Sequence, residues 1–225
     1  MPTVYRLRSP NSKDVDLNLS RFRAMLPSSM SLENRVDDLY LTVASPGNED
    51  ESTQQLINRE LDRVFFLTCV RVKAEMIRRT VTATYRGTWS VHGELPAGTG
   101  PLTWTDTVSL QLRLWSLASE VVDFSMKVIL YFQIIELSFP DTRDAANYPP
   151  YRDSSVPPHP RTESKLLRHL VAHAGLPQSE TRTYLRHLGL PEVASNQVHV
   201  HWESRLSTRL AVVEREARGV LRNAV

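Results

Sequence analysis

The feature that most constrains the fold is a long stretch, residues 106–137, in which apolar residues recur at helical spacing. Residues three, four or seven apart share one face of an α-helix, so the stretch predicts one amphipathic helix. Its apolar positions are Leu110, Leu114, Leu117, Val121, Phe124, Val128, Tyr131, Phe132 and Ile135. A helix of this length must bury that face against other helices, which predicts the central element of a helical bundle.

A proline-rich segment, residues 140–160, follows this helix and must be irregular. Loops of this length in compact domains are usually functional or disordered. Beyond it, helical periodicity and end signals predict three more helices. They run from Thr162 to a stop at Gly175-Leu176-Pro177, from Ser179 to about Leu188, and from Glu203 to Asn223.

The N-terminal half mixes strands and helix. Thr3–Leu7 and Asp37–Val43 alternate between apolar and polar residues, as half-buried strands do. Ser52–Val70 carries an apolar stripe at helical spacing and predicts a helix. Met76–Val91 is rich in β-branched and aromatic residues and predicts a strand or hairpin arm, and Glu94–Pro101 predicts a loop.

These patterns place the chain in the α+β class. Its 225 residues suffice for two small domains. We expect a mixed strand-and-helix module over residues 1–104 and an all-α bundle over residues 105–225.

Residues 161–225 carry a net charge of +4, against −2 for the remainder, and five of the seven histidines. Such an end suits an anionic partner such as nucleic acid, although a solvated helix surface explains the same charges.

Cys69 is the only cysteine, so an internal disulfide is impossible. It lies in the apolar run 64–70, which predicts a buried, inert thiol. Residues 1–20 lack the apolar segment of a secretory signal, and the most apolar run, residues 128–135, is too short to span a bilayer. We therefore expect a cytoplasmic protein without a membrane partner.

The helix predicted from Thr162 carries the residues best suited to chemistry. Its apolar residues Leu166, Leu167, Leu170, Val171 and Ala174 fall within one arc of the helical wheel. Arg168, His169 and His173 lie on the rest of the wheel. A permanent cation and two imidazoles are therefore expected together on the polar side of this helix.

Here the sequence resembles the HEPN (higher eukaryote and prokaryote nucleotide-binding) family, over about residues 105–225. The family signature is an arginine, a polar residue, three further residues and a histidine on the third bundle helix. Arg168-His169-Leu170-Val171-Ala172-His173 fits it. The order of long helix, irregular loop, motif helix, short helix and final helix also matches. The resemblance implies an RNA endonuclease that needs no metal or other cofactor, with Arg168 and His173 catalytic and His169 assisting.

The resemblance also implies partners. Family members pair as homodimers, so that two motif helices share one cleft, and RNA is the substrate. Such proteins commonly act in toxin–antitoxin or antiphage defence, where the partner is an antitoxin or a regulatory protein. Other members have lost catalysis and only bind. A non-catalytic binding or regulatory dimerisation module is therefore the alternative function.

The chemistry of RNA cleavage explains why these residue types are needed. Attack by a ribose 2′-hydroxyl on the adjacent phosphate requires proton transfers that histidine performs near neutral pH. Arginine stabilises the charge that develops on the phosphorane.

Other interpretations of the same residues stay open. His169 and His173, or His199 and His201, are spaced like half of a metal site. Arg168 suits a structural ion pair with Glu136 or Asp123. Arg182 and His187 repeat the arginine–histidine spacing on a shorter helix, with Thr183 where the family often has Asn, Asp or His, and we interpret them as a coincidental match.

Overall fold

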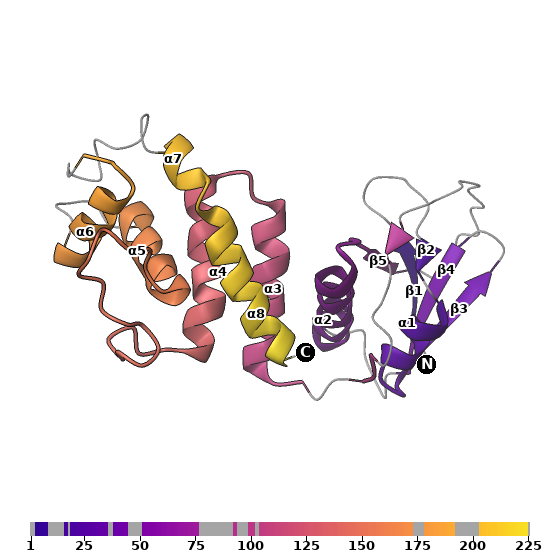
Figure 1. Cartoon of the computed structure of the whole chain (residues 1–225). Coiled ribbons are helices and arrows are strands. Elements are labelled where there is room, and N and C mark those ends of the chain that lie inside the picture. The colour runs from indigo at the N-terminus through magenta and orange to yellow at the C-terminus, as the bar shows by residue number, and fades with distance from the viewer. Residues whose placement is uncertain are drawn as a thin grey trace. The chain divides into compact units, whose positions relative to one another are not determined.

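The computed structural model describes residues 3–8, 16–17, 19–35, 38–44, 51–76, 92–93, 99–101, 104–172, 178–191 and 203–224. The chain divides into two compact units, Met1–Thr105 and Asp106–Val225. The strands of the larger sheet lie in the first unit, and the second unit is built of helices (Figure 1). The predicted α+β class is confirmed.

The first unit is centred on an antiparallel sheet with strand order β3-β4-β1-β5. Its strands are β1 (Thr3–Arg8), β3 (Met30–Arg35), β4 (Asp38–Val43) and β5 (Lys73–Met76). A parallel pair joins β2 (Asp16–Leu17) to β6 (His92–Gly93). The strands predicted at Thr3–Leu7 and Asp37–Val43 are confirmed as β1 and β4, and they pair with each other.

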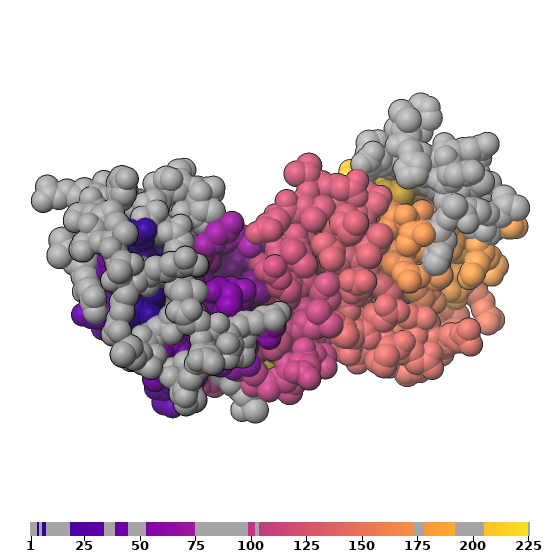
Figure 2. Space-filling view, turned by 180° about the vertical axis from the view of Figure 1, so that it is seen from behind, coloured from indigo at the N-terminus to yellow at the C-terminus, as the bar shows by residue number. Residues whose placement is uncertain are grey.

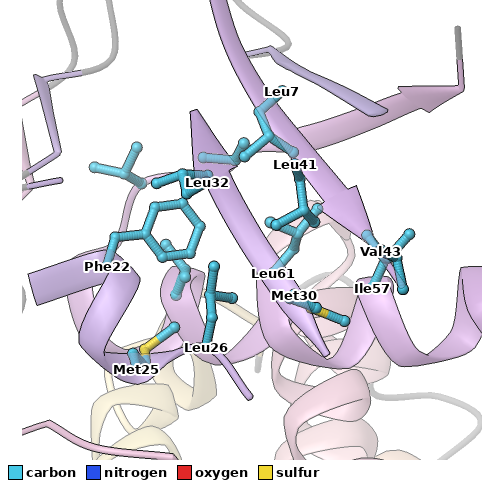
Figure 3. Close-up of a cluster of buried hydrophobic side chains, with 13 residues drawn as sticks. Leu7, Phe22, Met25, Leu26, Met30, Leu32, Leu41, Val43, Ile57 and Leu61 are labelled. Carbon is cyan, nitrogen blue, oxygen red and sulfur yellow. The ribbon is translucent and has the colours of Figure 1, made fainter. Parts of the chain in front are cut away.

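Two helices complete the first unit, α1 (Leu19–Met25) and α2 (Glu51–Thr68). The helix predicted at Ser52–Val70 is confirmed as α2. Alternate residues of β3 and β4 are buried, and they meet side chains of α1 and α2 in one apolar core (Figure 3). This core includes Phe22, Met25, Met30, Leu32, Leu41, Val43, Ile57 and Leu61. The sequence patterns did not indicate α1 or β3.

Most of the segment predicted as a strand, Met76–Val91, and part of the loop predicted at Glu94–Pro101 lie outside the described residues.

The prediction that the Cys69 thiol is buried is wrong, because its side chain is exposed. Helix α2 ends at Thr68, and Cys69 adopts the left-handed conformation (φ 57°) that commonly follows a helix C-terminus. The reversal of the backbone turns Cys69 away from the buried face of the helix.

The second unit contains α3 (Asp106–Glu120), α4 (Phe124–Ser138), α5 (Pro160–Ala172), α6 (Ser179–His187), α7 (Glu203–Ser207) and α8 (Leu210–Ala224). Helix α4 packs against α3, α5 and α8, so it is the central helix of this unit (Figure 1). The Gln111 side chain donates to the Ile134 carbonyl, and the Trp115 ring lies 5.1 Å from that of Tyr131. Helices α3 and α4 are therefore antiparallel.

The prediction of one helix over residues 106–137 is wrong. The chain leaves the helical conformation at residues 121–123, which separate α3 from α4. Asp123 has an extended backbone, and its carboxylate accepts a hydrogen bond of 2.7 Å from the Met126 amide. This is the geometry of an N-cap, which starts a new helix. Both helices keep the same apolar periodicity, which is why the pattern alone did not show the break.

The helix predicted at Glu203–Asn223 is also interrupted. Helix α7 ends at Ser207, and α8 begins at Leu210. The Thr208 hydroxyl donates to the Arg205 carbonyl, and the Arg209 amide donates to the Leu206 carbonyl. The resulting turn directs the Arg209 side chain toward α5, where it meets Glu163.

Residues 139–159 form an ordered segment, here called the strap, between α4 and α5. Carboxylates of Asp141, Asp144 and Asp153 accept hydrogen bonds from amides two residues later, which makes local turns. Tyr148 and Tyr151 are buried and donate to the Phe139 and Val156 carbonyls. In the space-filling view the strap lies beside the orange helices α5 and α6 (Figure 2).

Candidate functional site

Helix α5 carries the predicted site and is held along its buried side. Leu166, Leu167 and Leu170 are buried, and α5 packs against α4, α6 and α8. The helix begins at Pro160, a residue favoured in the first turn because its missing amide proton is not needed there. The Thr162 hydroxyl donates to the Pro149 carbonyl in the strap, at 2.9 Å.

Arg168 and His169 lie on the half-exposed side of α5, in its C-terminal half. The guanidinium carbon of Arg168 is 6.0 Å from the centre of the Phe132 ring on α4. Phe132 is buried, so the ring is a rigid support beneath the cation. His173 lies outside the described residues, so its predicted position is not tested.

Arg161 occupies an equivalent place two turns earlier on α5. Its guanidinium carbon lies 4.3 Å from the centre of the Phe139 ring. Arg161 and Arg168 are seven residues apart, as are Phe139 and Phe132, so antiparallel packing of α4 and α5 repeats the same contact. We call Arg161–Phe139 the first Arg–Phe pair and Arg168–Phe132 the second Arg–Phe pair. Cations over aromatic faces attract the ring electrons, and the attraction weakens beyond about 6 Å.

The first Arg–Phe pair has several additional partners. The Arg161 side chain donates to the Asn147 side-chain carbonyl at 2.8 Å. Its Nε lies 3.1 Å from the Glu216 carboxylate on α8. The Nε atom makes no well-directed hydrogen bond, so the contact with Glu216 is an ionic one. Arg161 thereby connects α5 to the strap and to α8.

A buried polar cluster adjoins Arg161 on the same half of α5. Glu163 accepts a hydrogen bond from the Tyr184 hydroxyl at 2.7 Å, and Arg209 donates to the same oxygen at 2.6 Å. Burial, followed by the nearby Glu163 carboxylate, raises the pKa of Tyr184. The hydrogen bond to Glu163 raises the pKa of Arg209. The cluster joins α5, α6 and the turn between α7 and α8, with its charges paired.

Two further contacts tie α6 to its surroundings. Lys165 lies 3.0 Å from the Glu180 carboxylate, and Glu180 also accepts a hydrogen bond from the Tyr151 amide at 3.2 Å.

Burial raises the pKa of Tyr148, in the strap, to about 12, and the Glu136 carboxylate adds to the effect. A neutral tyrosine at this position is thus part of the folded strap.

The second arginine–histidine match, Arg182 and His187, sits on α6 in a different setting. His187 Nδ1 lies 2.9 Å from the Ser154 carbonyl of the strap. Its ring stacks on Tyr184 with centroids 6.4 Å apart and meets the edge of Tyr151. The Arg182 side chain is exposed. His187 therefore has a packing role that accounts for a histidine at this place.

The motif residues also had two other interpretations, a structural ion pair and a metal site. Asp123, one of the ion-pair partners considered for Arg168, uses its carboxylate to cap α4. Over the described ranges, no three His, Cys, Asp or Glu side chains gather where a metal ion could bind. His173, His199 and His201 are outside these ranges.

Sequence reasoning missed the roles of Arg161, Glu163 and Arg209. The seven-residue spacing shared by Arg161–Arg168 and Phe132–Phe139 is a signal for the two Arg–Phe pairs, but only once α4 and α5 are known to be antiparallel. No local pattern links Glu163 to Arg209, because they are far apart in sequence and meet only through folding.

Within the described part of the chain, no helix has both the length and the apolar character needed to cross a membrane. The chain matches no protein-family model, and comparison with curated proteins and with solved structures finds no similar one.

Proposed function

We propose that the second unit is a metal-independent RNA endonuclease of the HEPN type. The observation that carries the proposal is the placement of Arg168 and His169. Both lie half-exposed on α5 of a helical unit, with the Arg168 guanidinium above the buried Phe132 ring. A contact with a buried ring restricts the motion of the guanidinium, whose planar fork of donors matches phosphate oxygens.

The proposed reaction assigns a role to each motif residue. The 2′-oxygen attacks phosphorus, and the bond from phosphorus to the 5′-oxygen breaks. A histidine accepts the proton of the 2′-hydroxyl, and a protonated group donates one to the departing 5′-oxygen. Arg168 stabilises the charge on the phosphorane, His173 transfers protons and His169 assists. The products are a 2′,3′-cyclic phosphate and a 5′-hydroxyl.

The test is a cleavage assay on single-stranded RNA with purified full-length protein. Because RNA supplies its own nucleophile, we expect the rate to stay the same in excess EDTA. Product ends are identified by mass spectrometry, which distinguishes a 2′,3′-cyclic phosphate from a 3′-hydroxyl. Loss of cleavage with EDTA and its return with Mg²⁺ or Zn²⁺ would refute the mechanism.

A single arginine–histidine set is a sparse active site, so the proposal includes a homodimer that pools two sets. Light scattering at micromolar concentration should give the mass of a dimer, and a monomer would contradict this part. By the same resemblance, a role as a toxin or antiphage effector predicts growth arrest on expression. An antitoxin or regulatory partner would relieve that arrest.

A second candidate function, a non-catalytic binding or dimerisation module, is favoured by a different observation. A pocket of about 540 Å³ between α3 and α4 is lined by Leu110, Leu114, Leu137 and Pro140, beside Gln133 and Glu136. Leu110 is 47% exposed and Leu137 is 36% exposed, so the pocket has apolar surface that a partner could cover. Intact RNA after incubation with a well-folded dimer would favour this function over the nuclease.

A further inference from the structure

A second pocket lies where the C-terminal ends of α4 and α8 meet the N-terminal end of α5. It measures about 470 Å³ and is lined by Ser138, Phe139, Arg161, Glu216, Gly219 and Asn223, among others. Pockets of about 300–1,000 Å³ with a few convergent polar groups are typical small-molecule sites. The motif residues Arg168 and His169 do not line it, so the pocket is distinct from the proposed catalytic groups.

Gly219 is the first indication that the pocket binds a ligand. It lies within α8, and glycine is the poorest helix-forming residue apart from proline. A Cβ atom at this position would meet no other described atom within 4 Å. Packing within the described part of the chain therefore does not require glycine here. A glycine does leave the backbone of α8 open to close approach from the pocket.

The charges of the pocket define what it can hold. Arg161 and Glu216 form an ion pair at 3.1 Å, with side chains 22% and 24% exposed. Because the two charges sum to zero, the pair gives no net attraction to a free anion or to a free cation. The pocket therefore favours a neutral ligand that offers both hydrogen-bond donors and acceptors. The Phe139 ring, stacked on Arg161, adds an aromatic surface that suits a flat ligand.

A nucleobase is flat and neutral and has donors and acceptors along its edges. Among the four RNA bases, guanine presents two adjacent N–H donors on its Watson–Crick edge, which match the two oxygens of a carboxylate. Its O6 and N7 acceptors match amide, hydroxyl or guanidinium donors. Adenine places an acceptor toward the carboxylate, and uracil and cytosine each place a carbonyl or ring acceptor beside their donor. Among the four bases, guanine therefore matches a carboxylate such as that of Glu216 best.

We propose that this pocket binds a guanine base of RNA, with Glu216 as the specificity-determining residue and Gly219 as the open wall. The link to cleavage rests on the proposed function. Arg161 and Arg168 are two helical turns apart, which is about 10.5 Å at 1.5 Å per residue. A strand whose scissile phosphate lies at Arg168 would thus reach the pocket with a nearby base. The nuclease would then favour RNA with guanine at one position near the cut.

The first experiment uses neutral nucleosides, which carry no phosphate for Arg168. Guanosine, adenosine, cytidine and uridine are titrated separately into the full-length protein, and binding is followed by NMR. We expect guanosine to bind at least about tenfold more tightly than the others, the effect of one good bidentate contact. Equal binding of the four nucleosides, or binding of none, would overturn the proposal.

Variants locate the binding. Gly219→Leu fills the pocket and should weaken guanosine binding at least about tenfold, while leucine, a better helix former, keeps or raises the melting temperature. Glu216→Gln should remove the preference for guanosine, and its melting temperature reports any cost of losing the ion pair with Arg161. Guanosine affinity that is unchanged in Gly219→Leu would refute the assignment of this pocket.

Arg168→Ala separates this proposal from the nuclease. It should abolish cleavage and leave guanosine binding unchanged, since the nucleoside has no phosphate. If guanosine binds in the pocket but RNA is not cut, the base site stands and the nuclease fails. If RNA is cut with no dependence on guanine and Gly219→Leu has no effect, the nuclease stands and the base site fails.

Discussion

The two ends of helix α5 carry the same residue type in different surroundings. At the N-terminal end, Arg161 stacks on Phe139 at 4.3 Å, donates to Asn147 and pairs with Glu216. At the C-terminal end, Arg168 lies above Phe132 at 6.0 Å, beside a half-exposed histidine. Two arginines at equivalent helical positions thus have different neighbours. The first joins α5 to the strap and to α8, and the second belongs to the arginine–histidine motif of the proposed site.

The residues near Arg161 add to the difference between the two ends of α5. The N-terminal half of α5 also holds the buried cluster of Glu163, Tyr184 and Arg209 and the ion pair between Lys165 and Glu180. A rigid anchor at one end of a helix holds the other end in position, and catalysis needs groups held to within fractions of an ångström. We therefore expect substitutions at the two ends to act on different properties.

The largest expected effect is on activity at the C-terminal end. Arg168→Ala and His173→Ala should each slow RNA cleavage at least about 100-fold, the usual scale for losing a charge stabiliser or an acid–base group. The melting temperature should stay close to that of the wild-type protein, because Arg168 is half-exposed. Rates come from single-turnover cleavage of a labelled RNA.

Arg182→Ala is the matched control, since Arg182 is exposed on α6 and belongs to the second arginine–histidine match. Its effect on cleavage should be small and should shrink further as salt rises, as expected for a peripheral phosphate contact. Equal losses from Arg168→Ala and Arg182→Ala would mean that the motif is misassigned. Unfolding of Arg168→Ala would instead support the structural ion-pair interpretation.

The largest expected effect on stability is at the N-terminal end. Glu163→Gln removes the charge that neutralises Arg209 and disturbs the acceptor of the buried Tyr184 hydroxyl. Breaking a buried pair from one side typically costs 3–5 kcal/mol, and we expect about 2–3 kcal/mol because Arg209 is 32% exposed. Urea unfolding followed by circular dichroism measures the change.

Tyr184→Phe is the matched control for Glu163→Gln, because it removes one hydroxyl and keeps the ion pair. It should cost less, about 1–2 kcal/mol. A free energy of unfolding within about 0.5 kcal/mol of the wild-type value for Glu163→Gln would show that the cluster does not anchor α5.

Arg161→Ala should have an intermediate effect on stability, about 1–2 kcal/mol. The loss combines the stack on Phe139, the hydrogen bond to Asn147 and a partly exposed ion pair with Glu216. Arg168→Ala, measured in the same unfolding experiment, should lose a weaker ring contact, because its guanidinium carbon lies 6.0 Å from the ring centre and that of Arg161 lies 4.3 Å away. The reverse order of the two ring contacts would remove the distinction between the two Arg–Phe pairs.

The smallest expected effect concerns α6 and the strap. His187→Ala loses the contact with the Ser154 carbonyl and the stack on Tyr184, at a cost of about 1 kcal/mol. Arg182→Ala should stay within about 0.5 kcal/mol of the wild-type protein, as exposed substitutions usually do. Cleavage rates of His187→Ala at a temperature well below its melting point should remain near the wild-type rate. A loss as large as that of His173→Ala would place His187 in the active site.

Periodicity predicted which stretches of the second unit are helical, because apolar spacing is a local property of the chain. It did not predict the break at residues 121–123, since the apolar stripe continues in phase on both sides. Asp123 is a common N-cap residue, but an aspartate inside an apolar pattern is also a common surface residue. The prediction that Cys69 is buried failed for a similar reason, because the helix ends at Thr68 and the left-handed backbone of Cys69 reverses the direction of its side chain.

The candidate site was predictable in part. Apolar and polar residues of α5 separate along its wheel, so the sequence placed Arg168 and His169 on the half-exposed side before the structure did. The Phe132 ring beneath Arg168 was not predictable, because it comes from another helix. The same holds for Glu216 and Gly219, which line one pocket with Arg161 only once α8 packs beside α5.

The sequence by itself determined the α+β class, the helical nature of the second unit and the polar side of α5. These follow from short-range spacing, which sets which face of an element is apolar. Only the tertiary structure decided which side chains Arg161 and Arg168 contact, and that Glu163 meets Arg209. Such contacts join residues of different elements, and their geometry depends on how the helices pack against one another.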